Sequence, residues 1–160
     1  EHAVEKAKEA LRAGSTIVTD MKMAWSGINK RTVEKLYGKA CNFISDEDVA
    51  QAATQHGFTR SAASMDKAAS LPGPLIFAIG NAPTALIRLY ELIEEGKLAP
   101  ALIIGVPVGF VNVVQAKELI METDVPYIIA RGRKGGSNVA AAICNALLYD
   151  LDSSRGMKKS

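Results

Sequence analysis

A turn rich in arginine and lysine has the residue types in this chain that most clearly indicate ligand binding. It reads Arg131-Gly132-Arg133-Lys134-Gly135-Gly136-Ser137 and lies between a short apolar run and an alanine-rich segment with helical spacing. Three cations beside the free N–H groups of a helix start would attract a carboxylate or a phosphate. We therefore predict an anion site at this turn, with a plain strand-to-helix turn as the alternative.

Two other loops rich in glycine and proline also follow apolar runs. In Gly80-Asn81-Ala82-Pro83-Thr84, Asn81 is predicted as the N-cap of a helix with Pro83 in its first turn. The free N–H groups of that helix would suit a carboxylate or a phosphate. Gly105-Val106-Pro107-Val108-Gly109-Phe110 is rigid and mostly apolar, which suits the wall of a binding site. Simple turns are the alternative interpretation of both loops.

Two charged residues stand at positions where they could meet a ligand. Arg60 begins a predicted helix in Thr59-Arg60-Ser61, where a cation is unfavourable unless it faces an anion or an acidic partner. We interpret it as a substrate contact, with a surface salt bridge as the alternative. Asp20 ends a predicted strand, where it would either orient a polar ligand or cap the helix that follows.

The sequence contains no motif for metal binding, hydrolysis or nucleotide binding. The sequence contains no HExxH, no cluster of cysteine and histidine, no GxGxxG after a strand and no GxxxxGK[ST]. Ser26, Ser61 and Ser137 lack an evident histidine partner for nucleophilic catalysis. His56 is predicted at a helix C-terminus and His2 in solvent, and we expect no cofactor.

Three strand–loop–helix units must position these loops. Continuously apolar runs at 75–79, 101–106 and 127–130 predict strands buried on both faces, and helices are predicted at 82–95, 111–122 and 137–148. Strands that alternate with helices of this length indicate a parallel sheet with right-handed crossovers.

The first half of the chain adds elements to the same unit. We predict a helix at 3–13, a strand at 16–20, a helix or turn at 21–27, a weaker strand at 41–44, a helix from Ser45 as N-cap, and a helix at 60–70. The fold class is therefore α/β, a single domain over 1–151 in three layers, with a mostly parallel sheet and helices on both faces. Residues 152–160 are predicted to form a polar tail.

Composition restricts the partners and the compartment. The chain has 160 residues and a net charge of +2, so no overall field favours nucleic acid. No apolar run is long enough to span a membrane, and no signal peptide is present. Cys41 and Cys144 are predicted as buried, unpaired thiols, which indicates a reducing, cytoplasmic location.

Five motifs in a fixed order resemble the precorrin-8X methylmutase family, and together they extend from about residue 4 to residue 148. They are Ile17-Val18-Thr19-Asp20-Met21 with Ala24, Gly27 and Ile28 after it; Thr59-Arg60-Ser61-Ala62-Ala63; Ala78-Ile79-Gly80-Asn81-Ala82-Pro83-Thr84-Ala85-Leu86; Gly105-Val106-Pro107-Val108-Gly109-Phe110-Val111; and the turn at 131–137.

The resemblance implies an isomerase of cobalamin biosynthesis that moves a methyl group from C-11 to C-12 of precorrin-8X or cobalt-precorrin-8. It implies no cofactor, a homodimer with the active site near the subunit interface, and a flat corrinoid substrate that bears many carboxylates. The residues expected to bind this substrate are Thr19, Asp20, Arg60, Ser61, Asn81, Thr84, Pro107, Gly109, Arg131, Arg133, Gly135, Gly136 and Ser137.

One departure from the family concerns the proton donor. The family's histidine, which protonates the macrocycle, lies in a segment that precedes the region matched here, and neither His2 nor His56 fits its motif. We therefore expect an N-terminal segment upstream of Glu1 and no catalytic residue within 1–160. The alternatives are a non-catalytic corrinoid- or tetrapyrrole-binding protein and a phosphate-binding α/β domain that uses the turn at 131–137.

Overall fold

A parallel sheet forms the centre of the protein. The computed structural model describes residues 2–109, 112–130 and 135–152, and within these ranges one sheet has five strands. They are β1 (Thr16–Thr19), β2 (Lys39–Asn42), β3 (Leu75–Ile79), β4 (Leu102–Gly105) and β5 (Tyr127–Ile129). Their order across the sheet is β2-β1-β3-β4-β5, and each neighbouring pair is parallel. The predicted α/β fold is confirmed.

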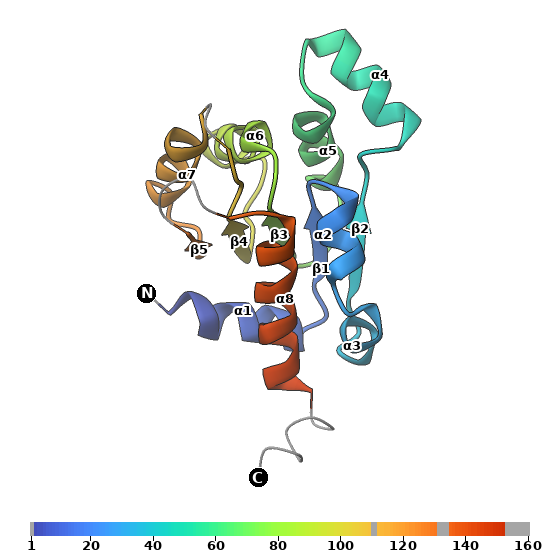
Figure 1. Ribbon diagram of the computed structural model, residues 1–160, viewed down its shortest axis with the longest axis vertical. Helices are drawn as coiled ribbons and strands as arrows, with labels where there is room; N and C mark the ends of the chain where they lie inside the picture. Colours follow the sequence, from blue (N-terminus) through green and yellow to red (C-terminus); the bar gives the residue numbers. More distant parts are fainter. Residues whose placement is uncertain (1, 110–111, 131–134, 153–160) are drawn as a thin grey trace.

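Helices cover both faces of the sheet, as Figure 1 shows. α1 (Ala3–Arg12), α2 (Lys22–Gly27), α3 (Lys30–Lys35) and α8 (Ser137–Leu151) contribute to one apolar core. α5 (Arg60–Ala68), α6 (Pro83–Glu94) and α7 (Val113–Met121) contribute to the core on the other face. α4 (Glu47–His56) stands outside these layers and packs on α5. The three-layer arrangement is the predicted one.

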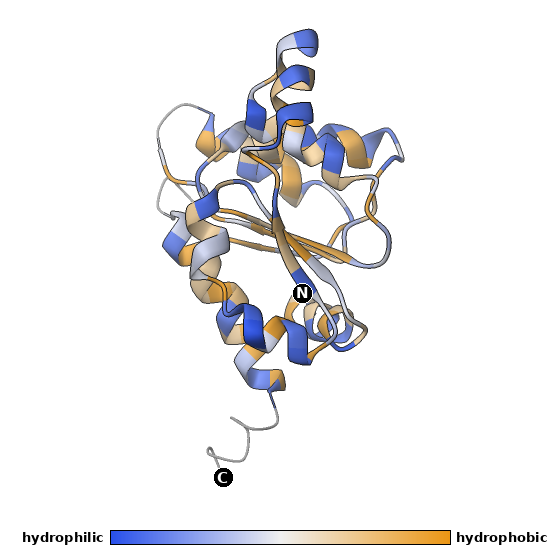
Figure 2. Cartoon of the chain, turned by 90° about the vertical axis from the view of Figure 1, so that its right-hand side faces the viewer, coloured by the Kyte–Doolittle hydropathy of each residue, from blue (hydrophilic) through white to orange (hydrophobic). Residues whose placement is uncertain are grey.

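Alternate residues of each central strand enter the two cores. In β3, Ile76 and Ala78 pack beneath α1 and α8, whereas Phe77 and Ile79 pack against α5, α6 and α7. Both faces of the strand are therefore apolar, which explains why the sequence shows a continuous run with no alternation. Figure 2 shows these strands in hydrophobic colours between the helical layers. None of the helices in the described ranges is long and apolar enough to cross a membrane.

The second strand and its cysteine differ from the prediction. β2 begins at Lys39, two residues before the expected 41–44, and ends at Asn42. Because β2 is an edge strand, Cys41 is only half-buried, so its prediction as a fully buried thiol is wrong. Cys144 in α8 is fully buried as predicted, and burial raises the pKa of its thiol to about 12.

Two helices between β1 and α5 also depart from the prediction. The N-cap of α4 is Asp46, one residue after the expected Ser45. Lys67 on α5 donates hydrogen bonds to the carboxylates of Asp46 at 2.6 Å and Asp48 at 3.0 Å, which tie the start of α4 to α5. The sequence did not predict α3, a short helix whose N-cap Asn29 accepts a hydrogen bond from its first turn.

The remaining elements lie within three residues of their predicted bounds. At the C-terminus the domain extends one residue further than expected. Asp152, predicted as the first residue of the polar tail, is buried at the end of α8, with its carboxylate 3.6 Å from Nζ of Lys35. Residues 153–160 lie outside the described ranges.

Replacing Asn145 with alanine is expected to lower the free energy of unfolding by about 1–3 kcal/mol. Its side chain on α8 accepts a hydrogen bond from the Asn29 backbone N–H and donates one to the Gly27 carbonyl, each at 2.8 Å. The change would leave both backbone groups without these partners. Chemical denaturation measures the effect. The matched change at Asn138, an exposed asparagine of the same helix, should stay within about 0.5 kcal/mol; equal losses would contradict the assignment.

Candidate functional site

The three glycine-rich loops leave the carboxyl ends of β3, β4 and β5 at one edge of the sheet. β1 and β3 are neighbours, although β2, which lies between them in sequence, is on the far side of β1. The chain thus adds strands in opposite directions from this point. In open parallel sheets such a reversal leaves a crevice beyond the carboxyl ends, where ligands bind. The candidate site consists of the residues that meet there.

Close backbone contacts join the three loops. A Cβ atom on Gly80 would lie only 2.5 Å from Cα of Ser137 at the start of α8. The Gly136 N–H donates to the Val106 carbonyl at 2.7 Å, and a Cβ atom on Gly135 would lie 2.0 Å from that same oxygen. Glycine is required at 80 and 135 because the chains approach so closely. The structure therefore brings together the three loops that the sequence singled out.

The other predicted residues of the second and third loops differ in their exposure. Pro107 is buried and Gly109 is half-buried, so the second loop offers an apolar surface of limited extent. Ser137 is buried where α8 begins. Arg131 and Arg133 lie outside the described ranges, and their role in anion binding stays a prediction.

Asp20 holds the first of these loops in place through hydrogen bonds to its backbone. Its carboxylate accepts hydrogen bonds from the backbone N–H groups of Gly80 at 3.1 Å, Asn81 at 2.9 Å and Ala82 at 2.7 Å. The predicted N-cap role of Asn81 is wrong, because Ala82 is the N-cap and the Asp20 carboxylate supplies the acceptor. These N–H groups are therefore already bound and do not await a ligand anion.

The Asp20 carboxyl group is shielded from solvent. The residue has no exposed surface, and burial raises the pKa of its carboxyl group above the ordinary value. The three amide hydrogen bonds partly oppose this effect because they favour the ionised form. The three amide hydrogen bonds offset part of the cost of burying this carboxyl group.

Thr19 and Ser61, two further predicted substrate contacts, are buried as well. The Thr19 hydroxyl donates to the Met21 carbonyl at 3.0 Å, and the side-chain amide of Asn42 donates to the Thr19 carbonyl at 3.2 Å. The Ser61 hydroxyl lies 3.8 Å from Sδ of Met21. Thr19 therefore links β1 to β2, and Ser61 links α5 to the residue that caps α2.

Thr59 and Thr84 bring two of the sequence motifs side by side. Thr59 caps α5 by accepting a hydrogen bond from the Ala62 N–H at 3.1 Å, and its hydroxyl lies 2.9 Å from the hydroxyl of Thr84 on α6. Arg60 is exposed at this junction. No acidic side chain of the described ranges forms an ion pair with it, so the alternative of a surface salt bridge finds no support there.

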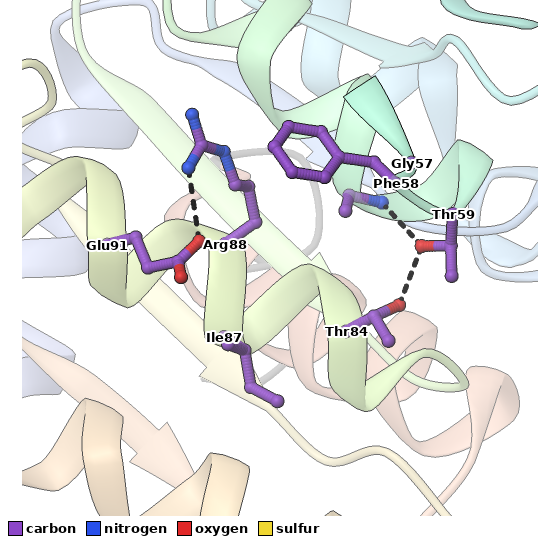
Figure 3. A pocket seen from close by; sticks show the side chains of 8 residues that line it. Gly57, Phe58, Thr59, Thr84, Ile87, Arg88 and Glu91 are labelled. Carbon is purple, nitrogen blue, oxygen red and sulfur yellow. Dashed lines mark hydrogen bonds and ion pairs between the residues drawn. The ribbon is translucent and has the colours of Figure 1, made fainter. Parts of the chain in front are cut away.

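A pocket of about 240 Å³, which the sequence did not predict, opens beside this junction (Figure 3). It is lined by Gly57, Phe58, Thr59, Ala62, Thr84, Ile87, Arg88 and Glu91. The Arg88 guanidinium donates to Asp66 at 2.9 and 3.0 Å and to Glu91 at 3.0 Å, and its carbon lies 4.9 Å from the centre of the Phe58 ring. Because two carboxylates already neutralise this cation, the pocket favours uncharged groups over anions.

His56 lies at a helix C-terminus and His2 is exposed to solvent, both as predicted. His56 is the last residue of α4, is exposed, and has its ring 5.8 Å from that of Phe58. His2 is exposed before α1, with Nδ1 3.6 Å from a carboxylate oxygen of Glu5. Neither is placed among the loops at the carboxyl edge. Within the described residues, no three side chains of histidine, cysteine, aspartate or glutamate gather as metal ligands would.

Comparison with known proteins gives the same family as the motifs. A family model described as precorrin-8X methylmutase matches residues 1–150. The cobalt-precorrin-8 methylmutase of Salmonella typhimurium is 47% identical over 93% of this chain and 70% of its own length, and that of Leptospira interrogans is 46% identical over 96% and 73%. A solved structure of the methylmutase from Thermus thermophilus superposes with a TM-score of 0.82 at 37% identity, over 92% of this chain and 72% of that one. The chain therefore belongs to the precorrin-8X methylmutase family.

Proposed function

We propose that this protein is a methylmutase of cobalamin biosynthesis that moves a methyl group from C-11 to C-12 of precorrin-8X or cobalt-precorrin-8. The observation that carries the proposal is the family match over residues 1–150, together with relatives named for these substrates. The reaction is a rearrangement within one molecule, so it neither gains nor loses atoms and needs no redox carrier. The product is hydrogenobyrinate or its cobalt form.

The described residues suit the holding of such a substrate better than the transfer of protons. A corrinoid is flat and bears many carboxylates, so it needs apolar surface together with separate polar contacts. Arg60 is an exposed cation at the carboxyl edge, Asn81 adds an exposed amide, and the loop with Gly109 adds the exposed apolar side chain of Val108. His2 and His56 are exposed outside this group, and we assign proton transfer to neither.

The proposal extends to the state of the protein in the cell. We propose a cytoplasmic homodimer with the active site near the subunit boundary, as the family resemblance implies. Among the described residues Cys41 and Cys144 are free thiols, which accords with a reducing compartment. Light scattering on the sample used for activity should give twice the mass of the 17.0 kDa chain, and a monomer would contradict the dimer.

The decisive experiment incubates the protein with precorrin-8X and follows its visible spectrum. Migration of the methyl group changes the conjugation of the macrocycle, so the absorption bands of the substrate should give way to those of hydrogenobyrinate. Hydrogenobyrinate itself should bind, with a measurable change in its spectrum on titration. An unchanged spectrum with no binding of the product would overturn the proposal.

The same assays separate the two alternatives. Binding of hydrogenobyrinate without turnover would indicate a non-catalytic corrinoid-binding protein. If inorganic phosphate raises the melting temperature while hydrogenobyrinate has no effect, the protein is a phosphate-binding domain instead. In the latter case the stabilisation should grow with phosphate concentration as mass action requires.

A further inference from the structure

Asp20 and the loop after β3 form the best-defined polar arrangement at the carboxyl edge. One carboxylate accepts all three consecutive backbone N–H groups of Gly80, Asn81 and Ala82, at 3.1, 2.9 and 2.7 Å. Oδ1 accepts the first of these bonds and Oδ2 accepts the other two. Asp20 has no exposed surface, so a substrate bound beyond the carboxyl edge does not touch it.

We propose that Asp20 is a positioning residue for the corrinoid: by holding the loop 80–82 in one shape, it places the groups of that loop that contact the substrate. This role differs from the substrate contact expected from the sequence, and it rests on the proposed function. Asp20 binds the backbone of all three loop residues, and the Thr84 hydroxyl, 2.9 Å from that of Thr59, ties the turn that follows to α5. Asn81, whose backbone N–H is held in this way, is exposed.

The arrangement depends on a carboxylate because all three donors need an acceptor. Asparagine has the same shape but replaces one oxygen with an NH₂ group, which donates and does not accept. If this group takes the place of Oδ1, the Gly80 N–H loses its acceptor; if it takes the place of Oδ2, Asn81 and Ala82 both lose theirs. Asp20→Asn therefore loosens the loop with little change in volume.

The test compares Asp20→Asn with the full wild-type chain and with Asp152→Asn as a matched control. Asp152 is also a buried carboxylate and pairs with Lys35. It lies at the C-terminal end of α8, and Figure 1 shows this end of the helix at the opposite side of the molecule from the loops. Three quantities are measured for each protein. They are the Kd for hydrogenobyrinate, the separate kcat and KM for precorrin-8X, and the hydrogen exchange rates of the amides at 80–82 against those of β4.

We expect Asp20→Asn to raise Kd and KM about tenfold or more, the effect of losing one charge-assisted hydrogen bond, with kcat at saturation changed less than about threefold. Exchange at 80–82 should accelerate while exchange in β4 does not. Asp152→Asn should change neither affinity nor loop exchange. Asp20→Ser, whose shorter side chain brings no oxygen to the positions of Oδ1 and Oδ2, should lose at least as much affinity, and it replaces Asp20→Asn if that variant does not fold.

Several results would overturn the inference. Unchanged Kd despite faster loop exchange would show that the loop does not position the substrate. A fall in kcat at constant KM would place Asp20 in the chemical step instead. If Asp152→Asn loses as much affinity as Asp20→Asn, or if neither Asp20 variant folds, the role of Asp20 is purely structural. If the wild type itself neither binds nor converts the corrinoid, the proposed function fails and the positioning role fails with it. If the wild type is active and Asp20→Asn has unchanged kinetics, the inference about Asp20 is wrong and the proposed function stands.

Discussion

Replacing Arg60 with alanine is expected to raise the Kd for hydrogenobyrinate by roughly 10- to 100-fold, the range of one charge-assisted hydrogen bond to a carboxylate. Arg60 is exposed beside the loop that carries Thr84, and no acidic side chain in the described ranges pairs with it. Its guanidinium is therefore available to a carboxylate of the substrate. Titration of hydrogenobyrinate against each variant, followed by visible absorption, measures the change.

Stability should hardly respond to the same substitution. A cation in the first turn of a helix opposes the helix dipole, so its removal costs nothing there, and exposed positions usually change stability by less than about 0.5 kcal/mol. Arg31→Ala is the matched control, because Arg31 is an exposed arginine in the first turn of α3, before β2 and away from the carboxyl edge. If both variants keep wild-type affinity, Arg60 is not part of the site; if both lose affinity equally, only overall charge matters.

The parallel sheet could be predicted because its strands carry a strong local signal. β3 and β4 are buried and β5 is only partly buried, and all three read as continuous apolar runs, with a glycine directly after β3 and at the end of β4. Because ligand sites in such sheets lie at the carboxyl ends, the same runs also located the loops. β2 was placed two residues late because it begins with the exposed Lys39 and ends with Asn42, so its sequence carries little apolar pattern.

The contacts inside the site could not be predicted in the same way, because they join distant parts of the chain. Asp20 and Gly80 are sixty positions apart, and the Arg88 and Asp66 side chains come from different helices. Asp20 reaches the loop after β3 only because the strand order places β3 beside β1. The sequence offers Asp20 two local roles, a ligand contact or a cap for the next helix, and the observed role is neither of these.

Motifs alone also do not separate the residues that contact a substrate from the buried residues that hold these contact residues in place. Thr19, Asp20 and Ser61 were predicted together with Arg60 because they stand in the same motifs, yet the first three are buried and Arg60 is exposed. A buried polar group needs partners within the protein, which for Asp20 are the backbone N–H groups of the first loop and for Thr19 and Ser61 include Met21. The predicted list therefore contains both the binding surface and the framework that gives it shape.

Gly80→Ala is expected to lower the free energy of unfolding by about 1–3 kcal/mol, the usual cost of forcing an extra methyl group into a packed region. The added Cβ atom would lie 2.5 Å from Cα of Ser137 and 2.7 Å from the carbonyl oxygen of Gly136, so backbone must move. Backbone movement at this point separates the first loop from the third. Because displacements of about 1 Å in a site can cost about 10²-fold in rate, we expect kcat/KM to fall on that order.

Gly105→Ala is the control that isolates this contact. Gly105 ends the neighbouring strand β4, and a Cβ atom there would meet only side-chain atoms, Cγ1 of Ile129 at 3.3 Å and the methyl groups of Leu86 at 3.4 Å. Side-chain ends can shift by a few tenths of an ångström, whereas the start of α8 is also held by the hydrogen bond from Gly136 to Val106. Gly105→Ala should therefore lose less stability and keep most of its activity. If Gly80→Ala denatures and turns over like Gly105→Ala, then the close approach of the first and third loops does not shape the active site.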